Sequence, residues 1–201
     1  MAWQTLVYQL KSDCQMIVHN GQTADPLNKW AKALKQISCK RKKTDADHEE
    51  MARIEFYAGL YIGKDGPIIP ARNVDSMLVN AAKKNREGQA AKSGVFCLRD
   101  ATMEYDGPRV VEDLWADERF RHVAIVRIGT ARVARTRPVF SEWTAKVQVQ
   151  IEDTVVNPKQ IDDWFHVAGT QVGLGDWRPQ HGRFSALRMN DNFNSLTREV
   201  K

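Results

Sequence analysis

The chain has 201 residues, of which 42% are hydrophobic, and its 30 Lys and Arg residues exceed its 25 Asp and Glu residues to give a net charge of +5. This composition can support one folded domain and excludes a wholly disordered chain. No apolar stretch reaches the roughly 18 residues of a membrane helix. The first residues also lack the basic and apolar regions of a secretory signal, so we expect a cytoplasmic protein without a membrane partner.

The three cysteines, Cys14, Cys39 and Cys97, lie far apart in the sequence. None of them forms a Cys-x-x-Cys pair or stands at zinc-binding spacing from a histidine. Such isolated cysteines are typical of reduced thiols in the cytosol. We therefore expect no metal ion and no other cofactor.

The first third of the chain predicts a strand, a helix and a strand pair. Residues 3–18 are expected to form a strand with a break near residues 12–13. Residues 27–37 carry apolar side chains at helical spacing. The stretch 54–69 is interpreted as two strands around residues 63–66, because Asp-Gly favours a hairpin turn.

The middle of the chain predicts a helix, a loop, a strand and a second helix. A helix is expected to follow Pro70 and to end near Lys84. Residues 85–94 are polar and contain glycine, which predicts an exposed, mobile loop. A strand is expected over residues 94–103 and a short helix over 111–120.

The last third carries the clearest patterns. Residues 122–129 are almost continuously apolar, which predicts a strand buried on both faces. Residues 142–152 alternate between apolar and polar side chains, as in a half-exposed antiparallel strand. A helix is expected to begin after Asn157, whose following proline suits the first helical position, and to end at Gly173. A final strand is expected over residues 184–189.

This order of elements predicts an α+β fold in which helices pack on one face of an antiparallel sheet. We expect a single domain with insertions over residues 1–190. The polar residues 191–201 are expected to form a C-terminal tail.

No sequence motif indicates a catalytic site. The chain contains no phosphate-binding loop, dinucleotide fingerprint, nucleophile elbow or zinc-protease motif. His122 and His166 are interpreted as structural residues. His19 and His181 are expected in loops, where either one is a candidate general acid or base. Together, the missing motifs and the scattered histidines favour a protein that is not an enzyme and has no catalytic residue.

Basic residues are better organised than the candidate catalytic groups. Arginines concentrate between residues 119 and 137, and arginine suits bidentate phosphate contacts and stacking on bases. Tryptophan and histidine in the loop that precedes the last strand offer further stacking faces. Each of these segments also has an interpretation without a ligand. The run 40–43 could be a solvated helix end, the segment 131–138 an ordinary hairpin, and the glycines from 173 an ordinary helix cap. The candidate nucleic-acid contacts are Lys40, Arg41, Lys42, Lys43, Arg132, Arg135, Arg137, Trp177, Arg178, His181 and Arg183.

Two groups of short motifs resemble those of a known family. The segment 66–72 (Gly-Pro-Ile-Ile-Pro-Ala-Arg) leads into a helix and is similar to the strand and turn that precede a helix in the RAMP superfamily. The segments 173–175 (Gly-Leu-Gly) and 182–184 (Gly-Arg-Phe) resemble that family's glycine-rich loop and final strand. The family includes the backbone subunits of CRISPR effector complexes. The stretch 127–183 also resembles uncharacterised phage and prophage proteins.

The resemblance implies a ferredoxin-like (RRM-like) antiparallel sheet with helices on one face and an inserted arm. It also implies noncatalytic binding of single-stranded nucleic acid, RNA rather than DNA, by a homo-oligomer or beside other CRISPR-type complex subunits. Some relatives cut RNA with a loop Asp or a His after the first strand, a region that holds His19 and Asp25 here. An endoribonuclease using His19, His181 or Asp25 is therefore one alternative. A phage interaction module that mimics or blocks a host complex is the other.

Overall fold

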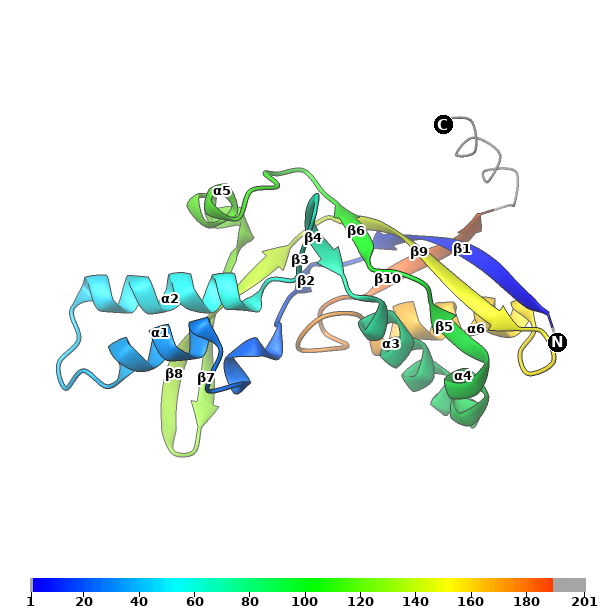
Figure 1. Cartoon of the computed structure of the whole chain (residues 1–201), viewed down its shortest axis with the longest axis horizontal. Helices are drawn as coiled ribbons and strands as arrows, with labels where there is room; N and C mark the ends of the chain where they lie inside the picture. Colours follow the sequence, from blue (N-terminus) through cyan, green and yellow to red (C-terminus); the bar gives the residue numbers. More distant parts are fainter. Residues whose placement is uncertain (1, 190–201) are drawn as a thin grey trace.

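The structure is a computed structural model that describes residues 2–189. It is an elongated α+β protein with two antiparallel sheets, as Figure 1 shows. The expected tail, residues 191–201, lies outside the described residues. Among the described helices, none is long and apolar enough to cross a membrane.

The larger sheet has the strand order β10-β1-β9-β6-β4-β3, with β5 also pairing with β9. Its strands are β1 (Trp3–Ser12), β3 (Ile62–Gly63), β4 (Gly66–Ile69), β5 (Val95–Cys97), β6 (Ala101–Glu104), β9 (Thr144–Glu152) and β10 (Phe184–Met189). Leu6 lies opposite Val149, and Leu10 lies opposite both Ala145 and Ala186. All five of these side chains belong to the hydrophobic core or pack against it, so the alternation expected for residues 142–152 is confirmed.

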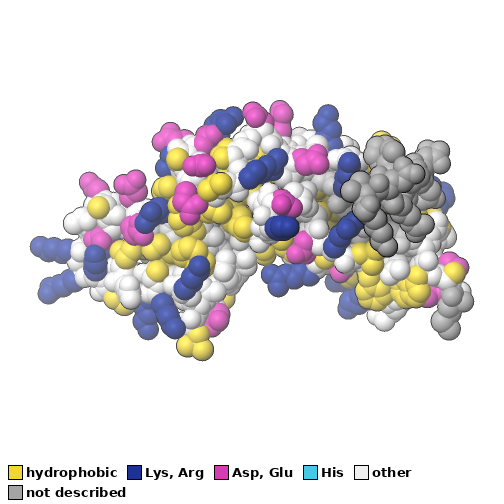
Figure 2. Space-filling view, turned by 45° about the horizontal axis from the view of Figure 1, so that its top comes forward, with side chains coloured by type: hydrophobic (Ala, Val, Ile, Leu, Met, Phe, Trp, Pro, Cys, Tyr) yellow, Lys and Arg dark blue, Asp and Glu magenta, His cyan; other side chains and the backbone are white. Residues whose placement is uncertain are grey.

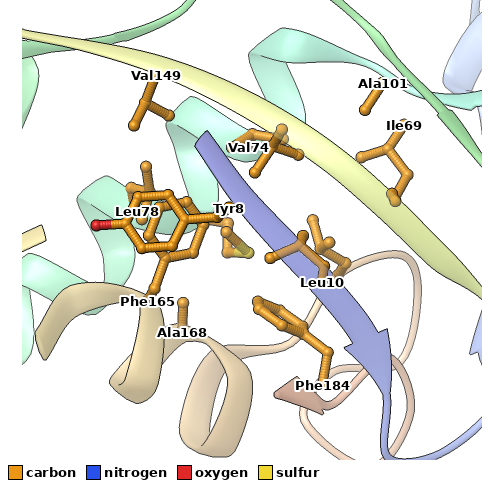
Figure 3. Close-up of a cluster of buried hydrophobic side chains, with 14 of the residues drawn as sticks. Tyr8, Leu10, Ile69, Val74, Leu78, Ala101, Val149, Phe165, Ala168 and Phe184 are labelled. Atoms are coloured by element: carbon orange, nitrogen blue, oxygen red, sulfur yellow. The ribbon is translucent and has the colours of Figure 1, made fainter. Parts of the chain in front are cut away.

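Three helices cover one face of this sheet (Figure 1): α3 (Ala71–Lys84), α4 (Gly88–Gly94) and α6 (Pro158–Val167). The core lies between the two layers, where the ring of Tyr8 stacks on Phe165 with 4.1 Å between centroids (Figure 3). Helix α6 begins as expected, because the Asn157 side chain accepts a hydrogen bond from the Gln160 amide and the Gln160 side chain accepts one from the Asn157 amide. A π-helical turn, η3 (Ala168–Val172), extends α6 to Gly173.

The remaining elements form a second part of the molecule, here called the lobe. It contains the helices α1 (Lys29–Ser38), α2 (Asp45–Gly59) and α5 (Val111–Ala116), the short 3-10 turns η1 (Gly21–Ala24) and η2 (Glu118–Phe120), and the strands β7 (Arg121–Ile128) and β8 (Ala131–Phe140). The strand β2 (Met16–Ile17) pairs with β8 and joins the lobe to the larger sheet. Aromatic edge-to-face contacts of Phe56 and Tyr57 with Trp115 hold α2 against α5.

Two sequence-based expectations are corrected in the first half of the chain. Residues 54–59 belong to helix α2 instead of a strand. Thr44 caps this helix in a reciprocal box with Asp47, and only residues 62–69 form the expected hairpin. Residues 88–94 of the expected loop form α4, because Ala91 packs into the core.

One further expectation is corrected in the hairpin of β7 and β8. The apolar strand β7 is not buried on both faces: Val123 and Ile125 are 61% and 66% exposed. Arg132, Arg135 and Arg137 lie on the regular strand β8, which pairs with β7 along eight residues of register. The hairpin therefore projects as one arm from the body of the protein (Figure 1).

Candidate nucleic-acid interface

The segment 173–183, here called the glycine loop, connects η3 to β10. The amide of Leu174 donates to the carbonyl of Gly182 over 2.8 Å, which closes the loop on itself. Gly182 has a φ of +76°, and a Cβ there would collide with the Leu174 carbonyl oxygen. Only glycine combines this backbone conformation with so close an approach.

The glycine loop also packs against the segment around β2. The amide of Asp176 donates to the Ile17 carbonyl over 2.7 Å, and the amide of Gly182 donates to the Gln15 carbonyl over 2.9 Å. A Cβ on Gly175 would collide with the Ile17 carbonyl oxygen. These contacts fix the position of the loop relative to the lobe, because β2 is also a strand of the lobe's sheet.

The arm and the glycine loop meet at one surface. On β7 and β8, His122 lies directly opposite Arg137. The Arg137 Nε lies 3.9 Å from the Asp176 carboxylate, and the His122 ring contacts Trp177 edge-on with 5.5 Å between centroids. Two segments that are far apart in the sequence are therefore in direct contact.

Burial and ion pairing change the pKa values of the charged groups at this contact. Desolvation lowers the pKa of Arg137, and its Nε is buried without a hydrogen-bond partner among the described residues. Asp176 lies 3.5 Å from the Nδ1 of His19. The hydrogen bond from His19 is the largest cause that lowers the pKa of Asp176, and Arg137 adds to it. Asp176 thus remains a carboxylate that orients two basic groups.

A groove of about 670 Å³ lies between the end of α3 and the glycine loop. Trp177 and Arg178 line one side of this groove, and Lys83 and Lys84 in the last turn of α3 line the other. We call this site the Trp177 groove. Neither lysine is among the contacts predicted from the sequence, because nothing in the sequence shows that the last turn of α3 faces a loop nearly a hundred positions later.

The other predicted contacts on the arm differ in how accessible they are. Arg132 is exposed and lies opposite Arg127 near the tip of the hairpin. Arg135 is committed to an ion pair with Glu55 of α2, which is buried. The Glu55 carboxylate also accepts a hydrogen bond from the Thr136 amide over 2.9 Å. Arg132 is therefore the freer cation of these two.

The basic run 40–43 lies away from the glycine loop. It forms the connection between α1 and α2 at one end of the molecule (Figure 1), where Lys and Arg side chains project into solvent (Figure 2). Lys40 pairs with Asp47 at 2.5 Å, and this contact, together with hydrogen bonds from Thr44, lowers the pKa of Asp47 to about 2. In the glycine loop, Arg183 is exposed and its amide contacts the Cys14 sulfur over 3.3 Å.

The candidate catalytic residues are only partly brought together. His181 lies beside His122, with 6.1 Å between ring centroids, and its Nδ1 is 3.3 Å from the Gln15 side-chain nitrogen. Asp25 is exposed beyond η1 and accepts a hydrogen bond from the Leu27 amide over 2.9 Å. Within residues 2–189, no three His, Cys, Asp or Glu side chains are arranged to hold a metal ion.

No protein-family model matches the chain, and no curated protein matches its sequence. The resemblance to the RAMP superfamily thus stays a hypothesis based on the segments 66–72, 173–175 and 182–184. What the structure adds is the geometry of the glycine loop and of the groove beside it.

Proposed function

We propose that this protein is a noncatalytic single-stranded nucleic-acid-binding protein, with RNA as the preferred ligand, that resembles CRISPR effector backbone subunits. The observation that carries the proposal is the Trp177 groove. Lys83, Lys84 and Arg178 supply positive charge there beside an indole ring. A cationic groove with an aromatic side chain is the combination that single strands use, since phosphates bind the cations and unpaired bases stack on the ring.

The strand order supports a ferredoxin-like fold for the larger sheet. Taken along the chain, β1, α3, β5, β9, α6 and β10 form a β-α-β-β-α-β sequence, and their strands lie in the order β10-β1-β9-β5. This is the arrangement expected of a ferredoxin-like unit. The β7–β8 hairpin then corresponds to the inserted arm.

The arm and the lobe extend the proposed contact surface. Arg132 and Arg127 lie opposite each other on the arm, which continues from the glycine loop through the contact of His122 with Trp177. Arg127 and Arg132 stand five positions from His122 and Arg137, so they lie on the opposite face of the hairpin and would bind a strand that passes around the arm. The run 40–43 is a separate contact at the end of the lobe, for a longer strand or a neighbouring subunit.

The proposal is tested by charge reversal in the groove. We expect the double variant Lys83→Glu/Lys84→Glu to bind a labelled, unstructured RNA with a Kd raised roughly tenfold, equivalent to about 1.4 kcal/mol. The slope of log K against log salt should become shallower by about 0.7 for each phosphate that the variant no longer neutralises. The matched control is Lys64→Glu, an exposed lysine in the turn between β3 and β4. Equal losses in both proteins, or wild-type binding that is indifferent to salt, would contradict the proposal.

A specific observation favours an endoribonuclease as the second candidate. The imidazoles of His122 and His181 face one surface with 6.1 Å between centroids, a separation that suits a general base and a general acid on either side of a phosphate. Incubation of the protein with single-stranded RNA, with and without Mg²⁺, separates the two functions. Cleavage that His181→Ala abolishes would replace the binding function with the catalytic one, and intact RNA would remove this candidate.

A further inference from the structure

Three of the five histidines gather at the contact between the arm and the glycine loop. His122 and His181 are neighbours through their rings and both contact Trp177, at 5.5 and 6.4 Å between centroids. His19 pairs with Asp176, the residue before Trp177, at 3.5 Å. The histidine cluster is therefore His19, His122 and His181, whereas His48 and His166 are exposed on α2 and α6.

The charged groups around His19 come from three elements. Asp176 of the glycine loop is its ion-pair partner at 3.5 Å. Arg135 and Arg137 of β8 and Glu55 of α2 line the same pocket, which has a volume of about 320 Å³. Glu55 is paired with Arg135, so these two charges largely offset each other. The Asp176 carboxylate and the Arg137 guanidinium therefore act most directly on the His19 imidazole.

The surroundings of His122 and His181 are more basic. His122 faces Arg137 across the strand pair and faces His181 across the loop. His181 contacts the uncharged Gln15 side chain, and the thiol of Cys14 donates to the neighbouring Gln180 carbonyl. Among the described residues, neither His122 nor His181 pairs with a carboxylate. The one such pair in this part of the chain joins Asp176 to His19. A proton on one of them would add a positive charge beside Trp177.

We propose that the histidine cluster makes nucleic-acid binding at this surface strengthen as the pH falls below neutrality. The inference rests on the proposed function and identifies a regulation of the same site. A phosphate that lies against the cluster stabilises each imidazolium, so binding takes up protons. A reaction that takes up protons is favoured by acid, and the affinity therefore rises as the pH decreases.

The protonation behaviour of the free protein agrees with this direction. Burial, and then the neighbouring His181, lower the pKa of His122, so in the free protein it is neutral over more of the physiological range than an ordinary histidine. An arriving phosphate raises that pKa again and draws in a proton. The lowered pKa of Asp176 keeps its carboxylate ionised throughout the same range, so Asp176 adds no opposing titration.

The test is a salt titration of labelled single-stranded RNA at two pH values, about 8 and about 5.5, which bracket histidine titration. For the wild-type protein we expect roughly tenfold tighter binding at the lower pH, and a salt slope steeper by about 0.7 for each imidazolium that pairs with a phosphate. The variant His19→Gln/His122→Gln/His181→Gln should bind equally at both pH values. The matched control, His48→Gln/His166→Gln, should keep the wild-type pH dependence.

Each result decides the inference. Salt-dependent binding with the same slope at both pH values would overturn it and leave the proposed function standing. A control variant that loses the pH dependence would also overturn it, whereas no salt-dependent binding at either pH would overturn both proposals. If the triple variant fails to fold by circular dichroism, the single variants His122→Gln and His181→Gln replace it, and each should remove part of the pH dependence.

Discussion

The larger sheet with its helices and the lobe are stabilised in different ways. The sheet part has a dense apolar core in which Tyr8, Trp164 and Phe165 are almost completely buried. In the lobe, every described side chain of α1 is at least partly exposed. The lobe shares this core through fewer buried side chains, among them Phe56, Leu114 and Phe120, and it adds the ion pair between Glu55 and Arg135.

This difference separates stability from the proposed binding. Burial of large apolar side chains stabilises the sheet part and leaves few charges at its centre. The lobe presents Arg132 and most of the run 40–43 to solvent, and it meets the sheet part at the glycine loop. We therefore expect substitutions in the sheet core to unfold the protein, and substitutions on the arm to change binding with little effect on folding.

The largest effect is expected in the core of the sheet part. Trp164→Ala removes a buried indole whose N–H donates to Glu87 over 2.6 Å. We expect the free energy of unfolding to fall by about 3–5 kcal/mol, as measured by urea denaturation. Trp164→Phe, which keeps much of the volume, should lose less. Equal losses in both variants would show that the hydrogen bond, and not the packing, dominates.

The next effect is expected at the glycine loop, which joins the two parts. Gly182→Ala forces a Cβ against the Leu174 carbonyl in a backbone conformation that alanine disfavours. We expect a destabilisation of roughly 2–3 kcal/mol, together with weaker RNA binding. Gly21→Ala is the control, because a Cβ there has no neighbour within 4 Å. If Gly182→Ala has the same melting temperature and the same RNA affinity as this control, the tight loop is required neither for stability nor for binding.

A smaller, local effect is expected from the ion pair of the lobe. Glu55→Gln weakens the support of Arg135 and of the Thr136 amide. We expect the free energy of unfolding of the lobe to fall by about 1–2 kcal/mol. Amide hydrogen exchange should then become faster than in the wild type in β8 but not in β1. Glu50→Gln, which affects an exposed pair with Arg53, is the control and should change little. Uniformly faster exchange in both parts would mean that they unfold together.

The smallest effect on stability is expected on the arm. Arg132→Glu reverses an exposed charge and should change the free energy of unfolding by no more than about 0.5 kcal/mol. The same substitution should reduce the salt slope of RNA binding by about 0.7 or more. Arg132→Lys keeps the charge and should retain that slope. Unchanged binding by Arg132→Glu would remove the arm from the proposed surface.

Local signals in the sequence predicted much of the sheet part. The alternation over residues 144–152 and the Asn157 cap of α6 follow from neighbouring residues alone, and both are confirmed. The strand expected over residues 54–59 was wrong because the helix begins about ten positions earlier, at the Thr44 cap. The expected burial of β7 was wrong because an apolar run does not reveal what packs against it.

The candidate site was harder to predict because it depends on long-range contacts. Lys83 and Lys84 join Trp177 only through the packing of α3 beside the glycine loop. The pairing of Arg135 depends on Glu55, eighty positions earlier. Residue types predicted a basic and aromatic surface, but the choice of cations within it required the folded chain.

Glu55 has a second consequence, for self-association. Strand β8 pairs with β7 on one side, but β2 covers only Val139 and Phe140 on the other. An uncovered strand edge is a template on which another chain can add a strand and start a polymer. Because the Glu55 carboxylate already accepts the Thr136 amide at that edge, we expect it to disfavour the addition of another chain there.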